Sequence, residues 1–117
     1  MNNFNQGIRY RLLKILQTEG SLTQREMAGR MGVSLGKVNF CMNELVKKGF
    51  VKVNRFKDAQ NKAKYAYLLT PGGMEEKARV TVRFLRAKMK EYEQIKKEIE
   101  TLSREIPDEI NAGALEP

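Results

Sequence analysis

The sequence contains no histidine, no tryptophan and a single cysteine among its 117 residues. Histidine is the most common general base of enzymes, and one cysteine can form neither an internal disulfide bond nor a cysteine-rich zinc site. Glycine-rich loops with the spacing of a phosphate-binding motif are also missing. These absences lead us to expect no enzymatic activity, no metal and no cofactor.

Long apolar runs are missing as well. No stretch approaches the ~18 consecutive apolar residues of a membrane-spanning helix. The first residues, MNNFNQ, lack the basic start and the continuous apolar segment of a signal peptide. A lone cysteine fits a reducing compartment. We therefore expect a cytoplasmic protein without a membrane partner.

Acidic residues are scarce in the first two-thirds of the chain. Residues 1–73 contain 13 Lys and Arg against 4 Asp and Glu, whereas residues 74–117 contain 9 against 10. The net charge of +8 therefore arises entirely in the first segment. Such a segment favours a polyanion, above all nucleic acid, as its partner, and solubility alone is the simpler alternative.

Two helices are predicted in the first 31 residues. Apolar residues recur at helical spacing from Asn5 to Thr18, and Gly20 follows as a stop signal. A second helix begins at a capping box formed by Thr23 and Glu26, and it ends two turns later at a glycine. Two turns are too short to be stable alone, so tertiary packing must hold this helix.

A third helix is predicted from its cap residue Ser34 to about Lys48, with Gly49 as the stop signal. Its inward stripe follows helical spacing and comprises Val38, Cys41, Met42, Leu45 and Val46. A short helix, a tight turn with glycine and a longer helix are typical of a helix-turn-helix. We interpret Cys41 as a structural residue, because reactive thiols need exposure and electropositive surroundings.

A β-hairpin and a long helix complete the predicted fold. Strands are expected at residues 50–56 and 65–69, around a polar, basic tip. Thr70 and Pro71 then begin a helix that continues to about Arg104. The fold class is mainly α with a small β-hairpin (α+β). We expect a winged helix-turn-helix domain at 5–70, a dimerisation helix at 71–106 and a flexible tail at 107–117.

The long helix carries an apolar seam with heptad-like spacing. The apolar residues that make up this seam are Ala78, Val82, Leu85, Met89, Tyr92, Ile95, Ile99 and Leu102. Its positions drift around the helix, which fits a nearly straight helix better than a long regular supercoil. A single helix cannot bury this seam, so the sequence predicts a homodimer.

The third helix supplies the predicted DNA-reading surface. Asn39 and Asn43 lie four residues apart on its outward face, and asparagine is a natural bidentate partner of adenine. The full predicted set on this helix is Ser34, Leu35, Gly36, Lys37, Asn39, Phe40 and Asn43. Phe40 has two open alternatives, which are folding back onto the wing or first helix and contacting a thymine methyl or a sugar.

Further DNA contacts are predicted from the second helix and from the hairpin, or wing. These residues are Thr23, Gln24, Arg25, Arg55, Lys57, Asn61, Lys62 and Lys64. The wing charges could equally serve to discourage aggregation at an exposed strand edge, and the two roles are compatible.

Three stretches carry a resemblance to a known family. Residues 34–39 (SLGKVN), 65–73 (YAYLLTPGG) and 75–79 (EEKAR) look like the MarR winged-helix regulators, and especially like the short ones associated with exopolysaccharide (EPS) gene clusters. The resemblance covers about residues 8–104. It implies a homodimer that binds a pseudo-palindromic site in double-stranded DNA, with exopolysaccharide genes as a possible target.

Two departures from the MarR pattern limit what the resemblance implies. The usual wing carries Asp-x-Arg, whose arginine enters the minor groove, whereas Asn61 and Lys62 stand near that place here. The wing contact therefore falls to Lys62 or Arg55. The usual N-terminal dimerisation helix, which helps to form a ligand pocket, is also missing, so we carry no small-molecule effector over.

Two other functions compete with DNA readout. A winged helix can be a protein–protein interaction module, for which Leu35 and Phe40 would be the apolar contacts. RNA binding is less well supported, since the chain lacks an aromatic stacking platform. A chain that fails to retard any DNA at low salt in a gel-shift assay would favour the protein–protein interaction module.

Overall fold

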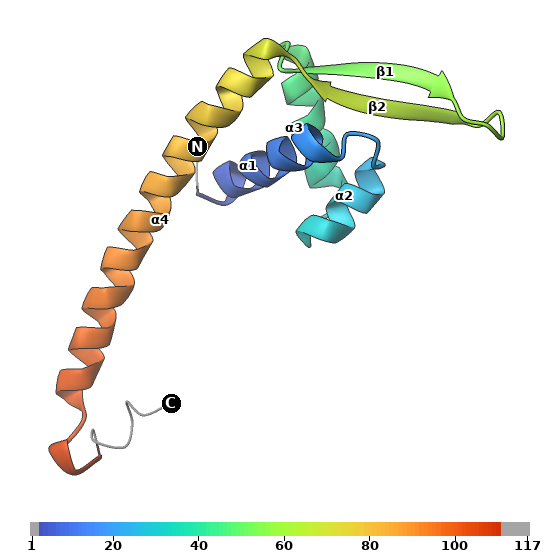
Figure 1. Ribbon diagram of the computed structural model, residues 1–117. Coiled ribbons are helices and arrows are strands. Elements are labelled where there is room, and N and C mark those ends of the chain that lie inside the picture. The colour runs from blue at the N-terminus through green and yellow to red at the C-terminus, as the bar shows by residue number, and fades with distance from the viewer. Residues whose placement is uncertain (1–2, 111–117) are drawn as a thin grey trace. The chain divides into compact units, whose positions relative to one another are not determined.

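The computed structural model describes residues 3–110 and confirms a mainly helical fold with one two-stranded antiparallel hairpin (Figure 1). Its elements are, in chain order, α1 (Asn3–Thr18), α2 (Gln24–Met31), α3 (Leu35–Lys47), β1 (Val51–Lys57), β2 (Ala63–Leu69) and α4 (Pro71–Glu105). Contacts within the chain divide it into two units, one that ends at Phe84 and one that begins at Leu85.

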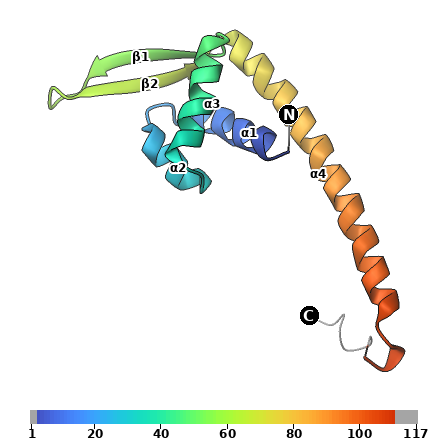
Figure 2. The same cartoon turned by 180° about the vertical axis from the view of Figure 1, so that it is seen from behind.

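The first unit has one hydrophobic core, between α1, α2, α3 and the base of the hairpin. In both views of the ribbon, α3 crosses α1, with α2 beside them (Figures 1 and 2). The fully buried side chains at its centre are Ile8, Leu12, Leu13, Met27, Val38, Met42 and Leu45. Val51 and Tyr67 from the hairpin and Val80 from α4 complete this core. The packing supplies the support that the two-turn helix α2 needs.

The predicted helix caps are confirmed. The Thr23 hydroxyl accepts a hydrogen bond from the Glu26 backbone N–H (3.0 Å), and the Glu26 carboxylate accepts one from the Thr23 N–H (3.1 Å). The hydrogen bond that the Thr23 backbone N–H donates to the Glu26 carboxylate is the main cause that lowers the pKa of Glu26. Ser34 caps α3 in the same way, through the Lys37 N–H (3.2 Å), and Thr70 caps α4 through the Gly73 N–H (3.0 Å). Local sequence therefore determines where these helices begin.

Two details of the predicted helices are wrong. Helix α1 begins at Asn3, two residues before the predicted start. Val46, which was predicted on the buried stripe of α3, is 37% exposed, and Cys41 is only partly buried. Val46 is displaced by about 80° around the helix axis from Val38, whereas Leu45 is displaced by only about 20°. That angle is enough to carry Val46 out of the core.

The strand bounds differ from those predicted. Strand β1 begins after Phe50 and includes Lys57, the first residue of the predicted turn, and β2 begins at Ala63, two residues before the predicted start. The register pairs Val51 with Leu69 and continues to Lys57 opposite Ala63. The tip is closed by Asp58, whose carboxylate accepts hydrogen bonds from the backbone N–H groups of residues 60 and 62 (both 2.9 Å). Asn61 adopts a left-handed conformation there (φ 63°), which asparagine tolerates. Backbone pairing therefore continues through polar residues that show no apolar alternation.

The first part of α4 packs against α1. The Glu76 carboxylate, which is buried, contacts the buried guanidinium of Arg9 in α1 (3.4 Å). Arg79 and Arg83 contact its other oxygen (3.3 and 3.4 Å). The rings of Tyr10 and Phe84 stack with centroids 5.1 Å apart. The beginning of α4 is therefore an integral part of the first unit.

The second unit consists of the remainder of α4, from Leu85, and the residues after it. The helix ends at Glu105, and residues 108–110 are helical again beyond Pro107. The predicted flexible tail lies mostly outside the described residues, since 111–117 are not described, and it stays a prediction. Within residues 3–110, none of the helices has the length and apolar character to cross a membrane. The same part of the chain contains no cluster of potential metal ligands.

Candidate nucleic-acid interface

The outward face of α3 is open and centred on a glycine. Gly36, Phe40, Asn43 and Lys47 are all exposed and recur at the spacing that places them on one stripe of the helix. A Cβ added at Gly36 would have only the Ser34 hydroxyl within 4 Å, at 3.9 Å. Another molecule can therefore approach the helix closely at Gly36.

Phe40 does not fold back onto the domain. Its side chain is 65% exposed and does not belong to the hydrophobic core or its periphery. This finding rules out one of the two alternatives for Phe40, and contact with a thymine methyl or a sugar stays a prediction. Leu35, at the beginning of the same helix, is 40% exposed.

The two asparagines predicted to contact bases belong to a hydrogen-bonded chain. The Asn43 Nδ2 group donates to the Asn39 Oδ1 atom (3.3 Å), and the Asn39 Nδ2 group donates to the Gln24 Oε1 atom (3.2 Å). The Gln24 Nε2 group in turn donates to the hydroxyl of Tyr67 in β2 (3.2 Å). This Asn43–Asn39–Gln24–Tyr67 chain links α3 to the wing through α2.

Sequence reasoning missed the link between Gln24 and Tyr67. Gln24 was predicted as a DNA contact, and Tyr67 only as one residue of an alternating strand. The two are 43 positions apart in the sequence, and their types carry no signal that would pair them. Their proximity follows only from the packing of α2 beside β2.

A shallow cleft of about 430 Å³ lies between the beginning of α2 and strand β2. Residues 21–24 and Glu26 line one side, and residues 63–65 and Tyr67 line the other. Lys64 and Glu26 bring opposite charges to it, so the cleft has no strong preference for an anion. Thr23 and Arg25, which were predicted to contact DNA, are both exposed at this end of α2.

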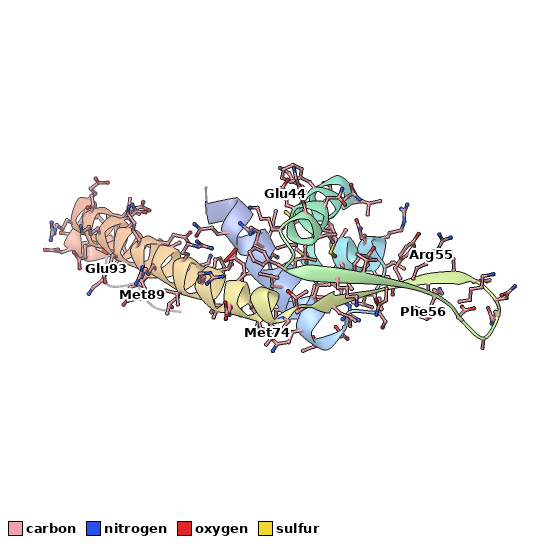
Figure 3. All side chains as sticks on the ribbon, turned by 90° about the horizontal axis from the view of Figure 1, so that it is seen from above. Glu44, Arg55, Phe56, Met74, Met89 and Glu93 are labelled. Atoms are coloured by element: carbon pink, nitrogen blue, oxygen red, sulfur yellow. The ribbon has the colours of Figure 1, made fainter. Side chains whose placement is uncertain are left out.

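The predicted wing residues are exposed, and the hairpin presents two different faces. Side chains alternate along each strand, so Arg55 and Phe56 point to opposite sides, as Figure 3 shows. Tyr65 lies opposite Arg55 in the register, and Lys64 lies opposite Phe56. The remaining predicted residues of the wing, Lys57, Asn61 and Lys62, are exposed at or beside the tip. The basic groups therefore surround the tip on both faces.

Cys41 lies at the boundary between the core and the surface of α3. Partial burial raises the pKa of its thiol, and the nearby Glu44 carboxylate adds to the rise, while Arg9 and Lys37 oppose it. A thiol in this setting is a poor nucleophile at neutral pH. The geometry agrees with the structural interpretation of this residue.

The predicted seam of α4 is exposed throughout. Its larger members, from Val82 to Leu102, are between 46% and 62% exposed, and Ala78 is exposed as well. Figure 3 shows Met89, one of these residues, on the ribbon of α4. The sequence analysis assigned no role to Val80 or Phe84. In the structure Val80 belongs to the hydrophobic core, and Phe84 stacks on Tyr10 of α1.

The sequence of the first unit matches a known family model. Residues 6–52 match the family described as winged helix-turn-helix DNA-binding. This segment contains most of α1, all of α2 and α3, and the first residues of β1, and the hairpin supplies the wing. The chain contains a winged helix-turn-helix domain. No curated protein matches the sequence.

Solved structures with this fold include several transcriptional regulators. The winged helix-turn-helix chain is similar to smu.1704 from Streptococcus mutans UA159, with a TM-score of 0.62, 19% identity and coverage of 73% of this chain and 82% of that one. A MarR-family regulator from Rhodococcus sp. RHA1 gives a TM-score of 0.55 at 23% identity, covering 82% and 70%. A point mutant of MepR from S. aureus, bound to an oligodeoxyribonucleotide, gives 0.51 at 22% identity, covering 88% and 78%. At these identities the likeness concerns the fold.

Proposed function

We propose that this protein is a sequence-specific, double-stranded DNA-binding transcriptional regulator that acts as a homodimer on a pseudo-palindromic site. The observation that carries the proposal is the outward face of α3, where exposed asparagines and Phe40 surround Gly36 in a basic domain. Asparagine can bind adenine bidentately, and an apolar side chain can contact a thymine methyl group in the major groove. The bound oligodeoxyribonucleotide of the MepR mutant supports DNA as the partner of this fold.

The wing has a separate role in this proposal. Lys62 and Arg55 lie in a hairpin whose tip can reach only the backbone or the minor groove while α3 occupies the major groove. Contacts of this kind neutralise phosphates and are largely independent of sequence. The exposed Thr23 and Arg25 at the beginning of α2 would add contacts to the backbone.

Two substitutions test this division. After selection of the preferred site from random duplexes, Asn39→Ala should cost about 1–3 kcal/mol on that site and little on a scrambled duplex. Lys62→Ala should weaken binding to both duplexes alike and lower the salt dependence by about one ion per subunit. The measurement is a salt titration of each variant on each duplex. Equal weakening by Asn39→Ala on both duplexes, or a site-specific effect of Lys62→Ala, would contradict the assignment.

The homodimer rests on the seam of α4. Large apolar side chains that recur along one helix and are about half exposed are typical of a surface that another helix covers. An identical helix offers the same stripe, so a two-fold dimer buries both seams with one contact. Two domains related in this way would contact two half-sites about one turn of DNA apart.

Membership of the MarR family and control of exopolysaccharide genes are finer parts of the proposal. Both are supported by the resemblance of residues 34–39, 65–73 and 75–79 to the short MarR-type regulators of exopolysaccharide clusters. The MarR-family structure from Rhodococcus agrees with the first at the level of the fold. Promoters of exopolysaccharide gene clusters are therefore the first natural duplexes to test.

A protein-binding module is the second candidate function. The exposure of Leu35 and Phe40 on the same helix favours it, because exposed apolar residues are typical contacts between proteins. The two functions differ in their simplest assay. Failure of the full-length chain to retard any duplex at low salt would favour the protein-binding module.

A further inference from the structure

The Asn43–Asn39–Gln24–Tyr67 chain extends from the interior of the domain to its surface. Tyr67 is buried in the core, Gln24 is half-buried, and Asn39 and Asn43 are exposed. Its three hydrogen bonds, of 3.2, 3.2 and 3.3 Å, come from three different elements. The exposed end of the chain coincides with the residues that we propose to contact bases.

The interior end of the chain is held firmly. The Tyr67 backbone N–H donates to the Gly20 carbonyl (2.9 Å), and its ring stacks on that of Tyr65 with centroids 6.5 Å apart. A Cβ at Gly20 would lie 2.1 Å from the Tyr67 carbonyl oxygen, so only glycine permits this approach. The adjacent capping box of Thr23 fixes the first turn of α2, which contains Gln24. Gln24 is therefore held between two fixed elements.

All three hydrogen bonds run in the same direction. Asn43 donates to Asn39, and Asn39 and Gln24 each accept one hydrogen bond from the side of α3 and donate one toward the wing. Head-to-tail chains of this kind polarise and strengthen one another. In this arrangement the Asn39 Oδ1 atom faces Asn43 and its Nδ2 group faces Gln24.

The chain leaves Asn39 with the groups that adenine requires. A side-chain amide has two N–H donors and an oxygen with two lone pairs. Asn39 uses one donor toward Gln24 and one lone pair toward Asn43, which leaves one donor and one lone pair. Those two remaining groups are the ones that a bidentate contact with adenine N7 and N6 uses.

We propose that Gln24 is a positioning residue for base readout, which holds the Asn39 amide in the orientation that recognises adenine and connects it to Tyr67. This inference rests on the proposed function. It replaces the sequence-based prediction that Gln24 itself contacts DNA. The bound DNA does not have to immobilise the Asn39 side chain, because Gln24 already restricts its rotation.

The test measures base preference in full-length protein, on the selected site and on the same duplex with the Asn39-dependent base pair changed. We expect Gln24→Ala to lower the ratio of affinities for the selected and the changed duplex roughly threefold to tenfold. This is the cost of ordering one side chain on binding. In the Asn39→Ala background the same substitution has no further effect on preference, because Gln24 acts through Asn39. Tyr67→Phe produces a smaller loss, which disappears in the Gln24→Ala background.

Gln24→Glu is the matched control. A carboxylate still accepts from Asn39, and the Tyr67 hydroxyl can turn to donate to it, so the base preference is retained. The added negative charge weakens binding to both duplexes alike. Thermal unfolding without DNA shows whether Gln24→Ala merely destabilises the fold. The NMR signals of the Asn39 side-chain amide, which should broaden or shift in that variant, report its loss of orientation directly.

The outcomes separate this inference from the proposed function. If the wild-type protein binds DNA but shows no preference for the selected site, the proposed function fails and the role of Gln24 fails with it. If the wild-type protein prefers the site and Gln24→Ala retains that preference, only the positioning role is wrong. A loss that persists in the Asn39→Ala background would show that Gln24 contacts DNA itself and would also overturn the positioning role.

Discussion

The two units of the chain differ in the solvent exposure of their large apolar side chains. In the first unit most large apolar residues of α1, α2 and α3 are buried, and the exposed exceptions, Leu35, Phe40 and Val46, all lie on α3. In the second unit the large apolar residues at Leu85, Met89, Tyr92, Ile95, Ile99 and Leu102 are all more than half exposed. The first unit has a hydrophobic core of its own, whereas the second has only one side of a core.

This difference indicates what each unit needs for stability. Covering the remaining half of a large apolar side chain contributes on the order of 1 kcal/mol, so a partner helix that covers the seam stabilises α4 by several such contributions. The first unit already has a buried core, so its stability depends much less on a partner. The first unit should therefore fold as a monomer, whereas the second half of α4 should need the helix of a second chain for its stability.

Removal of the second unit should have the largest effect. A chain that ends at Arg86 retains Val80 and Phe84, which pack against α1, and loses most of the seam. We expect a folded monomer, whereas light scattering should give about twice the 13.5 kDa chain mass for the full-length protein. Affinity for a two-half-site duplex should fall by roughly 10²- to 10⁴-fold, because the two domains are no longer linked.

A pair of substitutions in the full-length chain controls for the truncation. Ile95→Lys places a charge in the seam and should also give monomers, whereas Lys97→Ala, on the opposite side of α4, should leave the dimer intact. An unfolded truncated chain would show that the first unit is not independent. A full-length monomer at micromolar concentration would contradict the dimer.

Gly36→Ala should separate stability from binding. Alanine favours the helix over glycine by up to about 1 kcal/mol, and the added methyl group meets only open space, so the free energy of unfolding should rise. Affinity for the selected duplex should fall about tenfold, since the methyl group occupies the centre of the face that approaches DNA. Denaturant titration and DNA retardation measure the two effects.

Gly29 provides the matched control for Gly36. It is an exposed glycine of α2, and a Cβ there would also have nothing within 4 Å. Gly29→Ala should therefore raise stability without changing DNA affinity. If both substitutions weakened DNA binding equally, the open face of α3 would not be the binding surface.

Cys41→Ala should have the smallest effect. The cavity left by the thiol should lower the free energy of unfolding by roughly 1 kcal/mol, with DNA affinity unchanged. Burial raises the pKa of the folded thiol, so the folded chain keeps its proton to a higher pH than the unfolded chain does. The stability linked to this proton is complete below the unfolded pKa and is lost as the pH rises above about 8.5.

Alkylation of Cys41 by iodoacetamide measures that shift. The midpoint of the rate against pH should lie higher in the folded protein than in the unfolded protein, as the raised pKa requires. Rapid alkylation of the native protein at pH 7 would show instead a reactive thiol. The thiol would also be shown to be reactive if an oxidant weakened DNA binding by the wild-type protein but not by Cys41→Ala.

The sequence was sufficient to predict the features that depend on neighbouring residues. The caps at Thr23, Ser34 and Thr70 each involve groups within three positions, so they could be recognised without a fold. The apolar stripes of α1 and α3 and the seam of α4 have the same local character. The exposed outer face of α3 then follows as the complement of its buried stripe.

Features that depend on distant segments could not be predicted. Glu76 stands in a run of charged residues typical of a solvated helix, and it is buried because Arg9 meets it from 67 positions away. Gln24 is another example, since its partners Asn39 and Tyr67 come from two other elements. The strand extension at Lys57 and Ala63 depends on backbone pairing, to which side-chain patterns are insensitive.

The packing of α1 against the beginning of α4 has a consequence for synthesis on the ribosome. Helix α1 is made before α4, so Glu76 and Phe84, which contact Arg9 and Tyr10, are made last among the residues of the first unit. The domain can close only after these residues have emerged, and the rest of the seam follows them. We therefore expect domain closure to precede pairing of the seams, so that two finished domains meet as the last step of assembly.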